Sequence, residues 1–157
     1  MKLASPQAYS LQLFDEGPYG LSVDGAICKF SRPASASKHP KLYTLAVAGK
    51  LVYVGGASQS MSARLSLGFR ANGKGGYHGY KWKNLRNVLS LNVWSAEHDG
   101  RPATLRDFET VEAEVAFLCR RESGQWPEFQ HEIHFYRSLP RHRDAATEIY
   151  LHAVRAE

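Results

Sequence analysis

The distribution of apolar and β-prone residues predicts a β-hairpin near the middle of the chain. Residues 42–47 and 51–54 are rich in Leu, Val, Tyr and Thr, which favour strands. A Gly-Lys pair at 49–50 interrupts the two runs, and the glycines at 55–56 end the second. We therefore expect two antiparallel strands that are adjacent in sequence and in space.

Other segments have the pattern of strands and turns. Residues 10–14 alternate between polar and apolar side chains, and residues 27–30 could form another short strand. Residues 88–93 alternate leucine and valine with polar side chains, which predicts a strand after the hairpin. We expect a turn at residues 17–20 and a last strand or turn at residues 133–136.

Two segments have the spacing of amphipathic helices. Residues 58–67 place apolar side chains at i and i+4, and either Ser58 or Ser60 can cap the first turn. Residues 104–121 have the stronger pattern, with a threonine as N-cap, one apolar stripe and two arginines in the last turn. Residues 148–154 fit either a strand or a short helix.

Adjacent strands mixed with helices predict an α+β fold, with a small central antiparallel sheet flanked by helices. The chain has 157 residues, of which 43% are hydrophobic, which is enough for the core of one domain. We expect residues 41–157 to form this domain. Residues 1–40 are expected to be an N-terminal extension packed on or beside it.

Charge and cysteine content narrow the function classes only slightly. The formal net charge of +5 at pH 7 favours encounters with polyanions such as nucleic acids. Cys28 and Cys119 lie far apart without metal-ligand spacing, which indicates buried thiols. No apolar stretch fits a signal peptide or a bilayer span, so we expect a cytoplasmic protein with no membrane partner.

Four residues on the predicted elements supply the parts that phosphodiester hydrolysis needs. Tyr43 and Tyr53 lie on the two hairpin strands, Arg64 on the next helix, and Glu114 on the later helix. A carboxylate can hold a divalent metal, and the arginine fork matches phosphate. Tyrosine can serve as a base where a nearby metal or cation lowers its pKa.

These residues also carry a resemblance to a known family. Residues 42–45 (Leu-Tyr-Thr-Leu) and 52–55 (Val-Tyr-Val-Gly) resemble the two halves of the GIY-YIG nuclease motif. Arg64 falls on the helix where the family keeps its arginine. Residues 113–118 resemble the helix that carries the metal-binding glutamate, and residues 127–130 resemble the segment where many members have Pro-x-Tyr-Asn.

The resemblance implies a metal-dependent endonuclease that hydrolyses phosphodiester bonds in DNA with one Mg²⁺ or Mn²⁺ ion per site. In this interpretation Glu114 binds the metal and Tyr43 helps to deprotonate the attacking water. Arg64 neutralises phosphate charge, while Tyr53 and His78 orient water or phosphate. One such site cuts one strand.

The glycine-rich loop after the first helix, residues 72–80, completes the expected site. The His or Tyr that often follows the family's arginine by one helical turn would fall at Gly68. We therefore expect the next loop to supply it through His78 or Tyr80. Lys74 in the same loop is expected to contact backbone phosphates, and Gln130 is expected to brace the site by hydrogen bonds.

A shared site imposes a geometric condition on the hairpin. Tyr43 and Tyr53 are an even number of positions apart, so they share a face only if the loop has an odd number of residues. We predict a three-residue loop at 48–50. A strict two-residue turn would put the tyrosines on opposite faces unless a β-bulge repaired the register.

Two assignments stay open at the level of sequence. Glu112 and Glu114 lie on opposite flanks of the apolar stripe, and the resemblance favours Glu114 as the metal ligand. His131 and His134 form an H-x-x-H pattern, but their flanks resemble a strand, which would point them to opposite faces; a zinc site is not expected.

Other function classes fit the same sequence. One alternative is a catalytically inactive nucleic-acid-binding module of the same fold. Another is a structure-specific or RNA-directed nuclease, because chemistry at the phosphate does not distinguish the sugar. A third is a protein in which the tyrosines only fill the core. A homodimer or a partner protein is also open.

Overall fold

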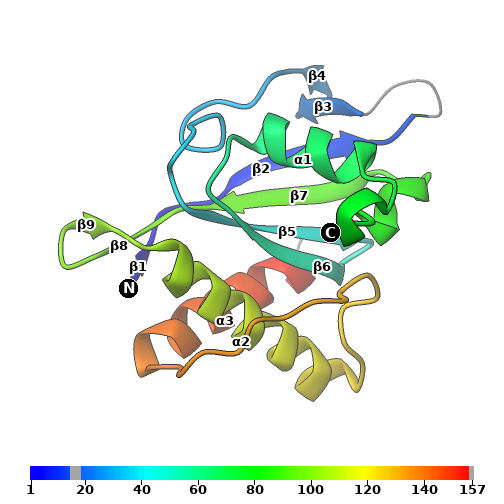
Figure 1. The fold of residues 1–157 in the computed structure, drawn as a ribbon. Coiled ribbons are helices and arrows are strands. Elements are labelled where there is room, and N and C mark those ends of the chain that lie inside the picture. The colour runs from blue at the N-terminus through cyan, green and yellow to red at the C-terminus, as the bar shows by residue number, and fades with distance from the viewer. Residues whose placement is uncertain (15–18, 156–157) are drawn as a thin grey trace.

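The computed structural model describes residues 1–14 and 19–155, so the turn expected at 17–20 begins outside the described residues. They form an α+β fold with antiparallel strands and three α-helices (Figure 1). In chain order the elements are β1 (Lys2–Leu3), β2 (Gln7–Gln12), β3 (Gly20–Val23), β4 (Ala26–Ile27), β5 (Lys41–Val47), β6 (Lys50–Ala57), α1 (Met61–Arg70), the 3-10 turns η1 (Lys74–Gly76) and η2 (Lys81–Asn84), β7 (Leu89–Trp94), β8 (Ala96–His98), β9 (Arg101–Pro102), α2 (Leu105–Ser123) and α3 (Pro140–Arg155).

The strands form two sheets. The main sheet has six strands in the order β4-β3-β2-β7-β5-β6, and a small sheet has the order β1-β8-β9. The hairpin β5–β6 therefore lies at one end, and β6 is the edge strand. The first 40 residues supply the three strands at the other end, so they are part of the sheet. The small β8–β9 hairpin has no counterpart among the sequence predictions.

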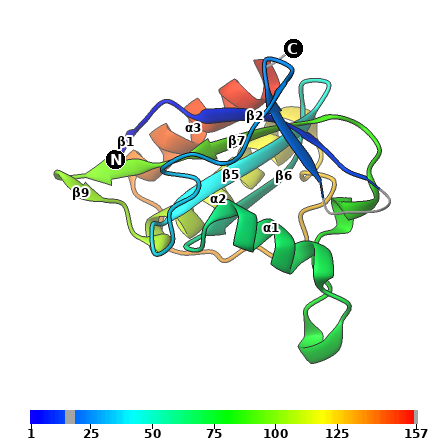
Figure 2. The same ribbon diagram turned by 90° about the horizontal axis from the view of Figure 1, so that it is seen from above.

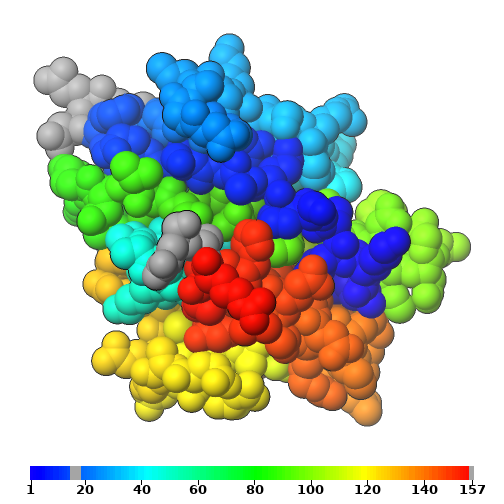
Figure 3. Space-filling view, turned by 180° about the vertical axis from the view of Figure 1, so that it is seen from behind, coloured from blue at the N-terminus to red at the C-terminus, as the bar shows by residue number. Residues whose placement is uncertain are grey.

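Helices cover both faces of the main sheet. Tyr43, Leu45 and Val52 pack on one face with α1 residues, whereas Leu42 and Val54 pack on the other face with α2 and α3. Viewed from above, α1 lies on one side of the strands and α3 on the other (Figure 2). From behind, α3 covers the molecule between the end of α2 and the first strands (Figure 3). The expected sheet flanked by helices is confirmed at this level.

The hairpin differs from its prediction in the turn. Val47 pairs with Lys50, so the turn has only two residues, Ala48 and Gly49, whose φ angles are 45° and 68°. Two positive φ values are typical of a type I′ turn, whose twist suits a hairpin. The prediction of a three-residue loop is therefore wrong.

A β-bulge in β6 restores the shared face. Tyr53 pairs with Leu45 and Leu51 pairs with Ala46, which leaves Val52 as an extra residue. Val52 and Tyr53 consequently both face the α1 side. Tyr43 faces the same side, and its ring centroid lies 5.8 Å from that of Tyr53.

The helices begin where their capping residues predict. The Ser60 hydroxyl accepts a hydrogen bond from Ala63 N, so Ser60 caps α1. Thr104 and Asp107 form a capping box at the start of α2, and Gly124 ends that helix with a φ of 78°. The segment expected at 148–154 is the second half of α3.

Residues 124–139, here called the connecting segment, join α2 to α3. No helix or strand forms in it, so neither a strand nor a helix occurs at 133–136. The segment runs back along α2 (Figure 1). In the described part of the chain, no helix is both long and apolar enough to cross a membrane.

Candidate functional site

A pocket of about 280 Å³ lies beside the free edge of β6. Tyr53 comes from β6, Arg64 from α1, Tyr80 from the glycine-rich loop, and Glu109 and Glu112 from α2. The connecting segment closes the remaining side. Five separate parts of the chain therefore meet at this pocket.

Three tyrosines and Arg64 form one cluster on the α1 side of the pocket. The hydroxyls of Tyr43 and Tyr80 lie 2.9 Å apart and share a hydrogen bond. The Tyr80 hydroxyl also lies 3.3 Å from the carbonyl oxygen of Arg64, to which it can donate. The ring centroids of Tyr53 and Tyr80 are 5.8 Å apart. Tyr53 and Tyr80 line the pocket, whereas Tyr43 is fully buried behind them.

Two glycines make room for these rings. A Cβ on Gly55 would lie 2.9 Å from Cε1 of Tyr53 and 3.0 Å from the hydroxyl of Tyr43. A Cβ on Gly68 would lie 2.1 Å from Cε2 of Tyr80. Tyr80 therefore fills the space over Gly68. The sequence analysis expected a side chain of the following loop at this place, because the family's His or Tyr would fall at Gly68.

Arg64 has no ion-pair partner among the described residues. Its guanidinium is partly buried, its Cζ lies 5.8 Å from the Tyr80 ring centroid, and its Nε atom is buried without a hydrogen-bond partner. Burial alone would lower its pKa, but the surrounding phenols of Tyr43, Tyr80, Tyr53 and Tyr77 raise the pKa above its ordinary value. A buried cation normally has a partner, so this one is suited to an anion from solution.

Glu112 and Gln130 satisfy the backbone of the edge strand. The Glu112 Oε2 atom accepts a hydrogen bond of 2.8 Å from Gly56 N, and Gln130 Oε1 accepts one of 3.2 Å from Val54 N. Gln130 Nε2 in turn donates to Glu112 Oε1 at 3.1 Å. Gln130 therefore braces Glu112 by hydrogen bonds.

The Glu112 carboxyl has a strongly shifted pKa. Burial raises it to about 7, and the hydrogen bonds from Gly56 and Gln130 and the charge of Arg64 offset only part of the effect. A carboxyl group that titrates near neutral pH inside a polar pocket is typical of functional sites. A nearby cation would stabilise the ionised form of this carboxyl group.

Glu114 lies outside this pocket. It lines a different hollow with Phe117, Tyr136 and Arg143. Two helical positions rotate a side chain by about 200°, so Glu112 and Glu114 cannot both face β6. The expected placement of Glu114 beside the tyrosines is therefore wrong, and Glu112 stands there.

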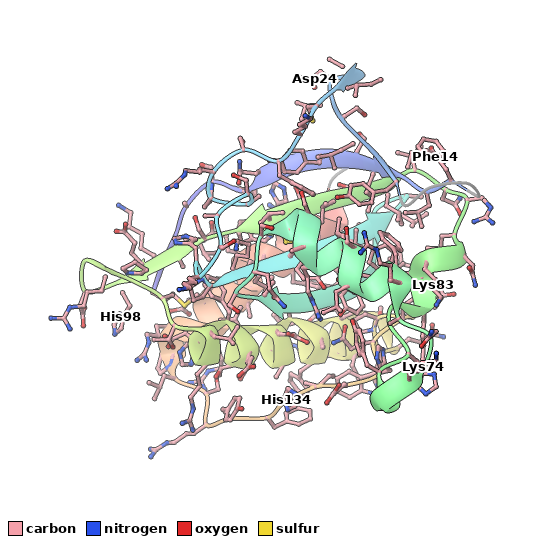
Figure 4. All side chains as sticks on the ribbon, turned by 45° about the horizontal axis from the view of Figure 1, so that its top comes forward. Phe14, Asp24, Lys74, Lys83, His98 and His134 are labelled. Carbon is pink, nitrogen blue, oxygen red and sulfur yellow. The ribbon has the colours of Figure 1, made fainter. Side chains whose placement is uncertain are left out.

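His78 and Lys74 also lie outside the lining of the pocket. Both are exposed, and the His78 ring lies against Gly73, where a Cβ would come within 2.7 Å of its Cε1. Lys74 stands on the η1 turn that projects from the body of the molecule (Figure 4). Of the two expected loop residues, the structure therefore brings Tyr80, rather than His78, to the site.

The buried tyrosines are poor bases in this environment. Burial raises the pKa of Tyr43, although Arg64 and hydrogen bonds lower it in part. Burial also raises the pKa of Tyr53 and of Tyr80 well above the ordinary value. The phenols are accordingly neutral hydrogen-bond donors. The expected role of Tyr43 in deprotonating water is not favoured by its position behind Tyr80.

The connecting segment adds residues that were not expected at this site. His131, Glu132 and His134 line the same pocket as Arg64, and Tyr77 lines it from the glycine-rich loop. His131 and His134 face one pocket because their segment is irregular, so the alternation of a strand does not apply. The H-x-x-H spacing marked these two histidines in the sequence, but the strand expected around them would have placed them on opposite faces.

The donor set at the pocket fits a hydrated divalent cation. No cluster of three or more His, Cys, Asp or Glu side chains arranged to hold a metal occurs among residues 1–14 and 19–155. Mg²⁺ usually keeps several waters and needs only one or two carboxylates plus phosphate oxygens. The buried carboxyl of Glu112 offers one such ligand.

Comparisons with models of protein families, with curated proteins and with solved structures found no match.

Proposed function

We propose that the protein is a divalent-metal-dependent endonuclease that hydrolyses phosphodiester bonds in DNA. One observation carries the proposal: the Arg64 guanidinium, which has no ion-pair partner among the described residues, and the phenols of Tyr53 and Tyr80 line the same pocket as the partly buried Glu112 carboxyl. An anion site beside a carboxylate is what metal-assisted cleavage of a phosphodiester requires.

Each group has a role in this proposal. Arg64 binds the scissile phosphate and offsets its charge, and the Tyr53 and Tyr80 hydroxyls donate hydrogen bonds to phosphate oxygens. Tyr43 positions Tyr80 through their shared hydrogen bond. Glu112 would hold one Mg²⁺ or Mn²⁺ ion, which supplies a Lewis acid and lowers the pKa of a bound water.

The resemblance to the GIY-YIG family supports the same reading. Tyr43, Tyr53 and Arg64, which carry that resemblance, meet at one cluster, and Gln130 reaches it through Glu112. The departure is the position of the carboxylate, which comes from Glu112 instead of Glu114. We therefore assign the metal ligand to Glu112.

A plasmid-nicking assay with Mg²⁺ or Mn²⁺ tests the proposal. We expect wild type to nick supercoiled plasmid only with metal, and Glu112→Gln to reduce the rate by about 100-fold or more. Glu114→Gln is the matched control, because it removes a carboxylate from the same helix on another face. We expect its rate to stay within about 2-fold of wild type.

Two results would contradict the proposal. If folded wild type cuts neither plasmid, single strands, flaps nor RNA with either metal, the chain is not a nuclease. If Glu114→Gln alone abolishes cutting, the site assignment is wrong. Cutting of RNA but not DNA would assign the chain to the RNA-directed alternative.

The second candidate function is a nucleic-acid-binding module without catalysis. It is favoured by the two backbone-directed bonds of Glu112 and Gln130, which also fit a purely structural role at the β6 edge. This candidate predicts DNA binding that depends on Arg64, does not change when Mg²⁺ is added and leads to no cutting. Binding by wild type, Arg64→Gln and Glu112→Gln, each measured with and without Mg²⁺, separates the two, because only a metal site makes binding depend on Mg²⁺ and on Glu112.

A further inference from the structure

Four exposed aromatic side chains gather on one surface beside the pocket. Among the described residues five aromatic side chains are exposed, and all except Phe14 belong to this group. Phe117 comes from α2, and Trp126, Phe135 and Tyr136 come from the connecting segment. Trp126 and Phe135 line one shallow hollow, while Phe117, Phe135 and Tyr136 line the next. We call these four residues the aromatic surface.

The aromatic surface is continuous with the candidate site. His131 lines both the pocket and the hollow of Trp126 and Phe135. Gln130 lines that hollow too, and its amide donates to Glu112. A polymeric ligand that extends from the pocket past His131 would therefore contact the exposed rings.

Two arginines lie next to side chains of the aromatic surface. The Cζ atom of Arg106 lies 4.6 Å from the ring centroid of Tyr136, and Arg143 lines the hollow of Phe117. Glu114 is the acidic residue among those lining the two hollows. Exposed rings with cationic neighbours suit the flat faces of nucleobases and the phosphates between them.

We propose that the aromatic surface binds the unpaired bases of a single-stranded nucleic acid whose backbone enters the pocket. This deepens the proposed function by assigning a substrate class with an unpaired strand next to the scissile phosphate. Paired bases hide their faces in the stack, so duplex DNA gains nothing from these rings. The affinity for a single strand is the property to measure, because it needs neither metal nor cleavage.

The experiment uses the full chain in EDTA and a fluorescein-labelled oligothymidylate, with binding followed by anisotropy. We expect Trp126→Ala and Phe135→Ala each to weaken single-strand binding by about 5- to 100-fold. Trp126→Phe keeps a ring and is expected to stay within about 3-fold of wild type. Duplex DNA of the same length should bind all variants alike.

Phe14→Ala is the matched control, because Phe14 is 54% exposed and lies at the opposite side of the molecule from His134 (Figure 4). Its single-strand affinity should be unchanged.

Wild type itself gives a second measurement, since Trp126 is 43% exposed whereas Trp82 and Trp94 are at 0% and 1%. Oligothymidylate should protect Trp126 from quenching by acrylamide.

Unchanged single-strand affinity in Trp126→Ala and Phe135→Ala, or no protection of Trp126, overturns the proposal. So does sedimentation showing a wild-type dimer that Phe135→Ala dissociates, because the surface is then covered by a second copy. Single-strand binding that depends on the rings without any nicking overturns only the nuclease function. Nicking with no effect of the rings overturns only the aromatic surface.

Discussion

Gly55 and Gly68 show how single residues decide the shape of the site. Neither needs an unusual backbone angle, and both are required by the rings that lie over them. Tyr43 and Tyr53 close over Gly55, and Tyr80 occupies the space at Gly68. At this scale the cluster depends as much on absent side chains as on the tyrosines themselves.

Gly55→Ala should destabilise the protein by about 1–3 kcal/mol, because its Cβ would lie 2.9 Å from the Tyr53 ring and 3.0 Å from the Tyr43 ring, so that these buried side chains must shift. Gly56→Ala is the neighbouring control, since its Cβ would meet its nearest atom, Glu112 Oε2, at an ordinary 3.5 Å. Urea denaturation followed by circular dichroism measures both. Equal stability of the two variants would show that the tyrosine rings yield easily.

Glu112 should make stability depend on pH. Its folded pKa of about 7 lies above the ordinary glutamate value of 4.5, so the folded state holds more protons between these values. Stability from this group is therefore present below pH 4.5 and falls as the pH rises through 7, by on the order of 2–4 kcal/mol. Thermal melts in EDTA should show a steeper decline from pH 5 to about 7.5 for wild type than for Glu112→Gln. Parallel curves would contradict the buried, raised-pKa carboxyl.

Among the elements, β6 contributes most to the site. Its bulge at Val52 turns Tyr53 to the same face as Tyr43. Along its free edge, the backbone N–H groups of Gly56 and Val54 donate to the side chains of Glu112 and Gln130 and so hold them at the pocket. Buried N–H groups need acceptors, so side chains from α2 and the connecting segment supply them. The edge strand thereby brings together residues far apart in sequence.

The helices α2 and α3 are joined at their N-terminal ends by Asp107. Its Oδ1 lies 3.0 Å from His142 Nε2, and Leu139 N donates to His142 Nδ1, so His142 Nε2 carries the proton. The carboxylate also caps α2 by accepting from Thr104 N. Although burial alone would raise the pKa of Asp107, hydrogen bonds from Thr104, His142 and Arg141 hold it below its usual value.

Asp107→Ala should cost about 2–4 kcal/mol, because it removes a helix cap and a partner of buried His142 together. Asp144→Ala on exposed α3 surface should change stability by less than about 0.5 kcal/mol. Chemical denaturation at neutral pH compares them. The deficit of Asp107→Ala should shrink as the pH falls below 3.8, where the unfolded carboxyl becomes protonated.

At the scale of the whole molecule, the six-stranded main sheet carries a packed layer on each face. Strand β2 lies between β3 and β7, so the N-terminal strands share the core around Tyr43 with the hairpin and α1. Trp82 belongs to this core and Trp94 to the core beneath α2 and α3. The pocket and the aromatic surface lie on the flank where the connecting segment returns along α2.

Leu11→Ala should lower the free energy of unfolding of the whole chain by about 2–5 kcal/mol, because Leu11 is fully buried in the sheet. Ile27→Ala, at a side chain 94% exposed, should have little effect. Tryptophan fluorescence and circular dichroism should report one shared transition. Separate transitions would mean that the first strands fold independently of the rest.

The hairpin, both amphipathic helices, the Thr104 cap and the α+β class could be predicted from the sequence, because these depend on local periodicity and capping. The sequence also identified Tyr43, Tyr53, Arg64 and Gln130 as candidate site residues. Three features emerged only in the folded chain: the two-residue turn with its bulge, the place of the first 40 residues in the sheet, and α3 as one helix. The fold also places Glu112 rather than Glu114, and Tyr80 rather than His78, in the lining of the pocket. Those outcomes depend on which helix face meets an edge strand and on which ring fits over a glycine, and such contacts form only between segments distant in sequence.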